Sequence, residues 1–281
     1  MRLTELETWY LWLMIYSFCG WVYECIICSV GHKKLINRGF LNGPYCPIYG
    51  SGAVLILLVL GRLKSPAALF FLGALLTCSL EYFTSWLMEK LFHARWWDYS
   101  KRFGNLNGRV CLLGATVFGL FSMVLVLWIH PAVKSLTDRI PQPALHWIAG
   151  LLLAAFISDY VVTLRGLRGT SGVFAEYEAI LQQRKAELEA RLKESPAYAA
   201  LRQRQEAAAD RLKELPGYEA LQEDYMALHS RLNFQQRRML RSFPELRLTE
   251  HNEVLTGLRH ALERARGHVE KHMPETVKDK K

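Results

Sequence analysis

The first 165 residues alternate apolar runs of about twenty residues with short polar loops. A helix of that length crosses the hydrocarbon core of a bilayer. Backbone polar groups in lipid must be satisfied within the segment, so such runs fold as helices. The sequence therefore predicts an all-α polytopic membrane bundle over residues 1–165. The expected spans are 8–29, 46–62, 66–89, 110–130 and 145–165.

The second of these spans is the weakest. It starts at Pro47-Ile-Tyr-Gly50, and its strongly apolar part, Ala53–Leu60, is short. A complete span and a re-entrant or broken helix both fit this pattern. A broken helix at membrane depth is tolerated only where it is buried in protein.

Lysine and arginine are unevenly shared between the two sides of a five-span arrangement. One side receives Lys33, Lys34, Arg38, Lys90, Arg95, Lys101, Arg102 and Arg109, and then the tail; the other receives Arg2, Arg62, Lys64, Lys134 and Arg139. Because cytoplasmic loops carry the excess of Lys and Arg, we expect a cytoplasmic tail and an external N-terminus in the cell membrane. The net charge of +9 fits loops that face an anionic leaflet, and nucleic acid is not an expected partner.

Carboxylates lie inside the predicted spans. Glu24 falls within 8–29 and Glu81 within 66–89, and Asp159 is a third candidate. A carboxyl group at bilayer depth costs several kcal/mol unless it is paired, protonated or facing water. Such residues are therefore expected inside the bundle.

Both glutamates share a helix face with small or polar residues. Ser17, Gly20 and Cys28 are spaced for the face of Glu24, and Ser85 and Glu89 for that of Glu81. Small-residue faces are typical of helices that pack closely in membranes. We expect both carboxylates to face each other, or an arginine (Arg38 or Arg109), in one polar pocket.

Two loops add polar candidates to these faces. The stretch 38–50 is rich in Gly, Asn and Pro, which break helices and expose backbone groups. The loop before the fourth span carries Trp96-Trp97-Asp98-Tyr99 and then Asn105-Leu-Asn107-Gly-Arg109. Aromatic residues of this kind also favour membrane interfaces.

Cysteine and histidine spacing gives no metal prediction. Cys25-x-x-Cys28 lies in a spanning helix without a second such motif, which favours small buried side chains. His268 and His272 are spaced for one helix face but lie in a charged end, which favours solvated surface. The first run is too long for a signal-peptide core and lacks a small-residue cleavage site, which indicates a retained helix.

Residues 166–281 are expected to form a separate cytoplasmic helical tail of coiled-coil type. The peptide RLKESPAYAAL (191–201) recurs as RLKELPGYEAL (211–221), and prolines 196, 216 and 244 mark helix breaks. Short helices are marginal alone, so the seams must pack on each other or on a second chain, which makes a homo-oligomer or a tail partner an expectation. Their apolar residues recur at coiled-coil steps: Phe174, Tyr177, Leu181, Leu188, Leu192, Tyr218, Leu221, Tyr225, Leu228 and Leu232.

Five stretches resemble the signature of the ABC-transporter permease family of CmpB type. They are GW-x-x-E (20–24), RGFLNGPYCPIYG (38–50), EYFTSWLMEKLF (81–92), WWDYS (96–100) and N-x-x-GR (105–109). The resemblance covers about residues 8–165 and implies passage of a substrate across a membrane, powered by a separate ATPase. The chain has no G-x-x-x-x-G-K-[ST] motif to hold nucleotide phosphates, so nucleotide hydrolysis is expected from a partner.

Three functions stay open. In a transporter, Glu24 and Glu81, with Asp159 as a third candidate, would bind a cation or proton, and Arg38 and Arg109 would gate the cytoplasmic mouth. In an enzyme acting on a lipid head group, an arginine would hold phosphate and a carboxylate would act as base, but no nucleophile–base pair is evident. In a scaffold, the charges would be ion pairs while the tail recruits a partner. No cofactor is expected; the candidate pathway residues are Glu24, Arg38, Asn42, Tyr49, Glu81, Glu89, Trp97, Asp98, Tyr99, Asn105 and Arg109.

Overall fold

Two compact units make up the chain in the computed structural model, which describes residues 3–33, 35–194 and 216–272. Unit 1 comprises Met1–Leu167 together with Arg238–Arg247. Unit 2 comprises Arg168–Arg237 and Leu248–Lys281. A ten-residue piece of the sequence-defined tail, 238–247, therefore belongs to the membrane unit, which the division at residue 165 did not anticipate.

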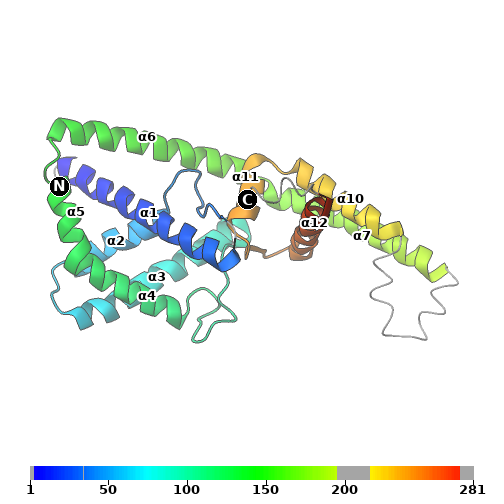
Figure 1. Ribbon diagram of the computed structural model, residues 1–281, viewed down its shortest axis with the longest axis horizontal. Helices are drawn as coiled ribbons and strands as arrows, with labels where there is room; N and C mark the ends of the chain where they lie inside the picture. The colour runs from blue at the N-terminus through cyan, green and yellow to red at the C-terminus, as the bar shows by residue number, and fades with distance from the viewer. Residues whose placement is uncertain (1–2, 34, 195–215, 273–281) are drawn as a thin grey trace. The chain divides into compact units, whose positions relative to one another are not determined.

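Unit 1 is a helix bundle, so the predicted all-α fold is confirmed (Figure 1). The strands of the described residues are β1 (Ala94–Arg95) and β2 (Arg247–Leu248), which pair with each other. The helices, in chain order, are α1 (Leu3–His32), α2 (Pro47–Leu60), α3 (Pro66–Phe92), α4 (Leu112–Val124), the π-helical turn η1 (Leu125–Ile129), α5 (His130–Thr137) and α6 (Gln142–Leu167).

Four helices of the described chain are long and apolar enough to cross a membrane, rather than five. They are Leu3–His32, Pro66–Phe92, Leu112–Thr137 and Gln142–Arg184, whereas α2 has 14 residues. Fourteen residues rise about 21 Å, less than the hydrocarbon core of about 30 Å. The second predicted span is thus the short helix α2, which starts at Pro47. Figure 1 shows that the described part of the chain between the end of α1 and the start of α2 is not helical.

Small residues bring the helices of unit 1 close together. A Cβ atom added to Gly20 would overlap the side chain of Tyr49, and one added to Gly73 would overlap Ser122. These positions join α1 to α2 and α3 to α4, in the manner typical of membrane helices. Unit 1 also has an apolar core, which contains Trp12, Tyr16, Ala53, Ile56, Leu57, Leu60, Leu69 and Leu125.

Unit 2 is built from the helices of the tail. They are α7 (Thr170–Glu194), α10 (Pro216–Arg231) and α12 (Asn252–His272), and α11 (Phe234–Ser242) begins there and ends in unit 1. Arg184 pairs with Asp224 at 3.2 Å and Arg231 with Glu176 at 2.9 Å, which ties α7 to α10.

The predicted apolar seam is buried where its side chains are described. Phe174, Tyr177, Leu181, Leu228 and Leu232 are buried, whereas Tyr225 is half-buried, and α7, α10 and α12 contact one another. The seams therefore pack within one chain. Helix α11 ends at Ser242, at the predicted break before Pro244. Most of the 20-residue repeat and the break at Pro196 lie outside the described residues.

Candidate functional site

Glu24 lies at the centre of a polar contact set between α1 and α2. The hydroxyl of Tyr49 donates to its Oε1 at 2.6 Å. Arg38 Nε lies 3.4 Å from its Oε2 and forms an ion pair. Gly20 leaves room for the Tyr49 ring. The expectation that Glu24 faces an arginine is thus confirmed for Arg38.

Glu81 on α3 lies in the same neighbourhood and is almost fully buried, with 7% of its surface exposed. The side chains of Tyr99 and Glu24 are both near enough to its carboxylate to act on it electrostatically. Among the described residues, its Oε2 atom has no hydrogen-bond partner. A buried carboxylate oxygen without a partner is costly unless the group holds a proton or a cation.

We call Glu24, Arg38, Tyr49, Glu81 and Tyr99 the polar cluster. Its members come from α1, from the segment before α2, from α2, from α3 and from the loop after α3. Two carboxylates and one guanidinium give it an excess of acidic groups. It is therefore suited to a positively charged guest.

Asp159 on α6 anchors the non-helical segment before α2. Its Oδ1 accepts from the backbone N–H of Asn42 at 3.0 Å and from the Asn42 amide at 2.6 Å. Its Oδ2 accepts from the Gly43 N–H at 2.8 Å and from the Tyr45 hydroxyl at 2.7 Å. A carboxylate that accepts this many bonds replaces the water that irregular backbone would need. Asn42 and Asp159 are thus structural partners.

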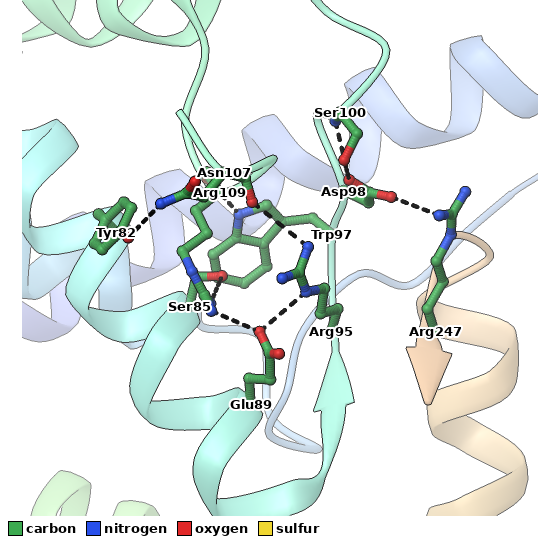
Figure 2. A network of polar contacts seen from close by, with 10 residues as sticks. All are labelled: Tyr82, Ser85, Glu89, Arg95, Trp97, Asp98, Ser100, Asn107, Arg109 and Arg247. Atoms are coloured by element: carbon green, nitrogen blue, oxygen red, sulfur yellow. Dashed lines mark hydrogen bonds and ion pairs between the residues drawn. The ribbon is translucent and has the colours of Figure 1, made fainter. Parts of the chain in front are cut away.

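Glu89 is the centre of a second network, at the end of α3 (Figure 2). Its Oε2 lies 2.8 Å from Arg109 Nη2 and 3.0 Å from Arg95 Nε. Arg109 also donates to Ser85 Oγ at 3.2 Å, and its guanidinium lies over the Tyr82 ring at 5.5 Å. Both arginines near Glu89 are therefore already paired.

The loop between α3 and α4 is held by its own polar side chains. Trp97 Nε1 donates to the Arg109 carbonyl at 3.0 Å, and Asn105 donates to the carbonyls of Ser100 and Arg102. Asp98 accepts from Ser100 and pairs with Arg247 at 2.8 Å (Figure 2). Burial raises the pKa of Asp98, but these bonds and the Arg247 charge outweigh it and keep the pKa below its ordinary value.

A contact set that the sequence did not reveal joins segment 238–247 to the same loops. Arg238 donates to the carbonyls of Gly39, Phe40 and Leu41. Ser242 Oγ donates to the Asn37 carbonyl at 2.8 Å. In the sequence these residues belong to a polar helical tail, and only the break at Pro244 sets them apart.

The predicted site residues therefore separate into three groups. Glu24, Arg38, Tyr49, Glu81 and Tyr99 form the polar cluster; Asn42 belongs to the Asp159 anchor; Glu89, Trp97, Asp98, Asn105 and Arg109 hold the loop after α3. No group of three or more His, Cys, Asp or Glu side chains suited to a metal ion occurs among the described residues. The part of the predicted site residues in a substrate pathway stays a prediction.

A family model described as Putative ABC-transporter type IV matches residues 11–164. No curated protein matches the chain, and no solved structure does. The matched range contains the helices and loops that carry the polar cluster, and it ends before unit 2 begins.

Proposed function

Because the chain belongs to the family described as Putative ABC-transporter type IV, we propose that it is a transport subunit that moves a substrate across the cell membrane. Helices α1, α3, α4–α5 and α6 form four crossings of its membrane part, and the short α2 with the non-helical segment before it forms the fifth. A separate ATPase supplies the energy. Because this bundle encloses little interior, a second membrane chain completes the pathway, either another copy or a different subunit.

The observation that carries a cation or proton pathway is the state of Glu81. It is buried, and its Oε2 is without a hydrogen-bond partner among the described residues. Ionisable residues inside a membrane bundle mark ion and proton pathways more often than packing sites. A proton or a monovalent cation at Glu81 satisfies the free oxygen, and Glu24 and Tyr99 complete the contact.

The two alternative functions have less support. A lipid-head-group enzyme needs an arginine with donors free for phosphate, but Arg95 and Arg109 both pair with Glu89. A purely structural role suits Glu89 and Asp159, whose oxygens accept several bonds. It leaves Glu81 unexplained, because its Oε2 bonds no described residue.

Glu81→Gln is expected to reduce cation or proton flux about tenfold or more, because a neutral amide neither takes up a proton nor attracts a cation. Flux is measured with pH-sensitive and alkali-metal-sensitive dyes in membrane vesicles energised with ATP, which retain the native partners. Folded yield after detergent extraction is measured in parallel. The amide has nearly the size of the carboxyl, so the yield should stay close to wild type.

Glu89→Gln is the matched control for this change. It removes the same charge from the same helix, eight residues further on, but leaves Arg95 and Arg109 without their anion. Its folded yield should therefore fall. If Glu81→Gln lost folded yield and kept its flux per folded molecule, the structural interpretation of Glu81 would replace ours. Absence of flux in wild-type vesicles would refute ion transport itself.

The proposed orientation has a cytoplasmic tail and an external N-terminus, on the basis of the loop charges. Single cysteines at Ser65 and Ser171, both exposed, test it in a variant without native cysteines. A membrane-impermeant maleimide should label Ser65→Cys from outside intact cells and Ser171→Cys only after permeabilisation. Labelling of both from one side contradicts this topology.

A further inference from the structure

The non-helical segment before α2 is held by an arginine almost 200 positions away in the sequence. Arg238 Nη1 donates to the Gly39 carbonyl at 3.0 Å and to the Leu41 carbonyl at 2.9 Å, and its Nη2 donates to Phe40. Three successive backbone carbonyls thus share one guanidinium. Because carbonyls outside a helix need a donor, this contact replaces hydrogen bonds that the fold itself does not supply.

Arg38, the ion-pair partner of Glu24, also belongs to this contact set. Its Nε faces the Glu24 carboxylate at 3.4 Å, while its Nη1 donates to the Ser242 carbonyl at 3.2 Å. The guanidinium also lies 4.6 Å from the centre of the Phe243 ring, a cation–π distance. One side chain therefore contacts both the polar cluster and segment 238–247.

The other end of the segment is fastened to the loop after α3. Arg247 pairs with Asp98 at 2.8 Å, and the Phe243 ring packs against Trp96 at 5.0 Å between centres. Tyr99, whose side chain lies near the Glu81 carboxylate, follows Asp98 in this loop. The segment thus contacts both loops that contribute residues to the polar cluster.

The chain on both sides of this segment belongs to the other unit. Residues up to Arg237 and from Leu248 onward are part of unit 2. Any displacement of unit 2 is therefore passed to both ends of the segment through the covalent chain. We propose that Arg238–Arg247 is a releasable lock: the tail holds the two loops in place through it, and its withdrawal loosens Arg38 and opens the polar cluster.

Arg238→Ala tests the lock through a thiol already present in the protein. Cys25 Sγ accepts from the Arg38 backbone N–H at 3.2 Å, so its reactivity reports on the segment that Arg238 holds. Loss of one charge-assisted hydrogen bond changes an opening equilibrium about tenfold. We expect Cys25 in the purified full-length protein to be alkylated by a maleimide at least ~10-fold faster, as read by peptide mass spectrometry.

Two controls separate release from general unfolding. Arg241→Ala removes the same charge from an exposed position three residues further along, and Cys25 should react at the wild-type rate. Cys111 is buried at the start of α4, and it should stay slow in every variant. An unchanged Cys25 rate in Arg238→Ala overturns the lock, and so does equal acceleration of Cys111, because the segment would then be an ordinary part of the fold.

Arg247→Ala provides a second, milder variant if Arg238→Ala does not fold. It frees only the end at Asp98, so Cys25 should react about 2- to 3-fold faster; no acceleration there counts against the lock.

The consequence for the polar cluster rests on the proposed function. In energised vesicles, Arg238→Ala should raise flux several-fold over Arg241→Ala, because withdrawal of segment 238–247 loosens Arg38 and opens the polar cluster. If Cys25 were alkylated faster but flux stayed unchanged, the proposal that segment 238–247 controls the opening of the polar cluster would be overturned. If wild-type vesicles carry no flux, the transport proposal fails, while the alkylation rates still decide whether the segment is a lock.

Discussion

Asp159→Ala is expected to lower the free energy of unfolding by about 3–5 kcal/mol, one of the largest effects of any single change in unit 1. The substitution leaves the backbone N–H groups of Asn42 and Gly43, the Asn42 amide and the Tyr45 hydroxyl without their acceptor. A fully buried donor left unsatisfied costs about 1–3 kcal/mol; these four donors are only half-buried, so the expected total lies at about 3–5 kcal/mol and not higher. The loss is measured as the unfolding midpoint of the purified protein in mixed detergent micelles.

Ser158→Ala is the matched control, since Ser158 is the exposed neighbour of Asp159 on the same helix. It should unfold as the wild type does. Asp159→Asn should lie between the two, because its amide oxygen still accepts while its amide nitrogen faces other donors. An Asp159→Ala protein within about 1 kcal/mol of wild type would mean that the segment is held by other contacts.

Gly73→Leu is expected to have an effect of comparable size, about 3 kcal/mol, and to reduce the amount of folded protein recovered. Even a Cβ atom at this position would overlap the Ser122 side chain, which is fully buried. Helices α3 and α4, which carry Gly73 and Ser122, must therefore separate or bend. Folded yield and the unfolding midpoint in detergent both report the change.

Gly150→Leu gives the same substitution at a glycine where an added Cβ meets no atom within 4 Å. It should be neutral in both measurements. If the two leucine variants behaved alike, the close approach of α3 and α4 at Gly73 would not contribute to stability. A Gly73→Ala variant should show a smaller loss than Gly73→Leu, because Ser122 has less to accommodate.

Hydropathy and spacing were enough to predict the bundle but not its irregular part. The long spans follow from composition alone, because a segment surrounded by lipid has to form its backbone hydrogen bonds internally, as a helix does. The short α2 was only partly predicted: Pro47 marked its start, but the support for the chain before it comes from Asp159, more than 110 residues later. A contact of that kind has no local signature.

The same distinction applies to the polar cluster. Glu24 and Glu81 were predicted because a carboxylate inside an apolar run is rare and costly. Tyr49 and Tyr99 were candidates through the loops that carry them, yet their pairing with one glutamate each depends on how those loops fold back. Arg238 was not predicted, because an arginine in a charged helical tail has the pattern of solvated surface.

The anchor at Asp159 also determines the order in which the protein is assembled. A ribosome releases Asn42 and Gly43 early, but the carboxylate that accepts from both lies 117 and 116 residues further along the chain. Arg238, which covers the neighbouring carbonyls, is made later still. Chains fold from the N-terminus during synthesis where contacts are local, so here the first helical pair must wait for the last span. Until then its unfinished backbone needs another partner, such as water or an insertion chaperone, and truncation before α6 leaves it permanently exposed.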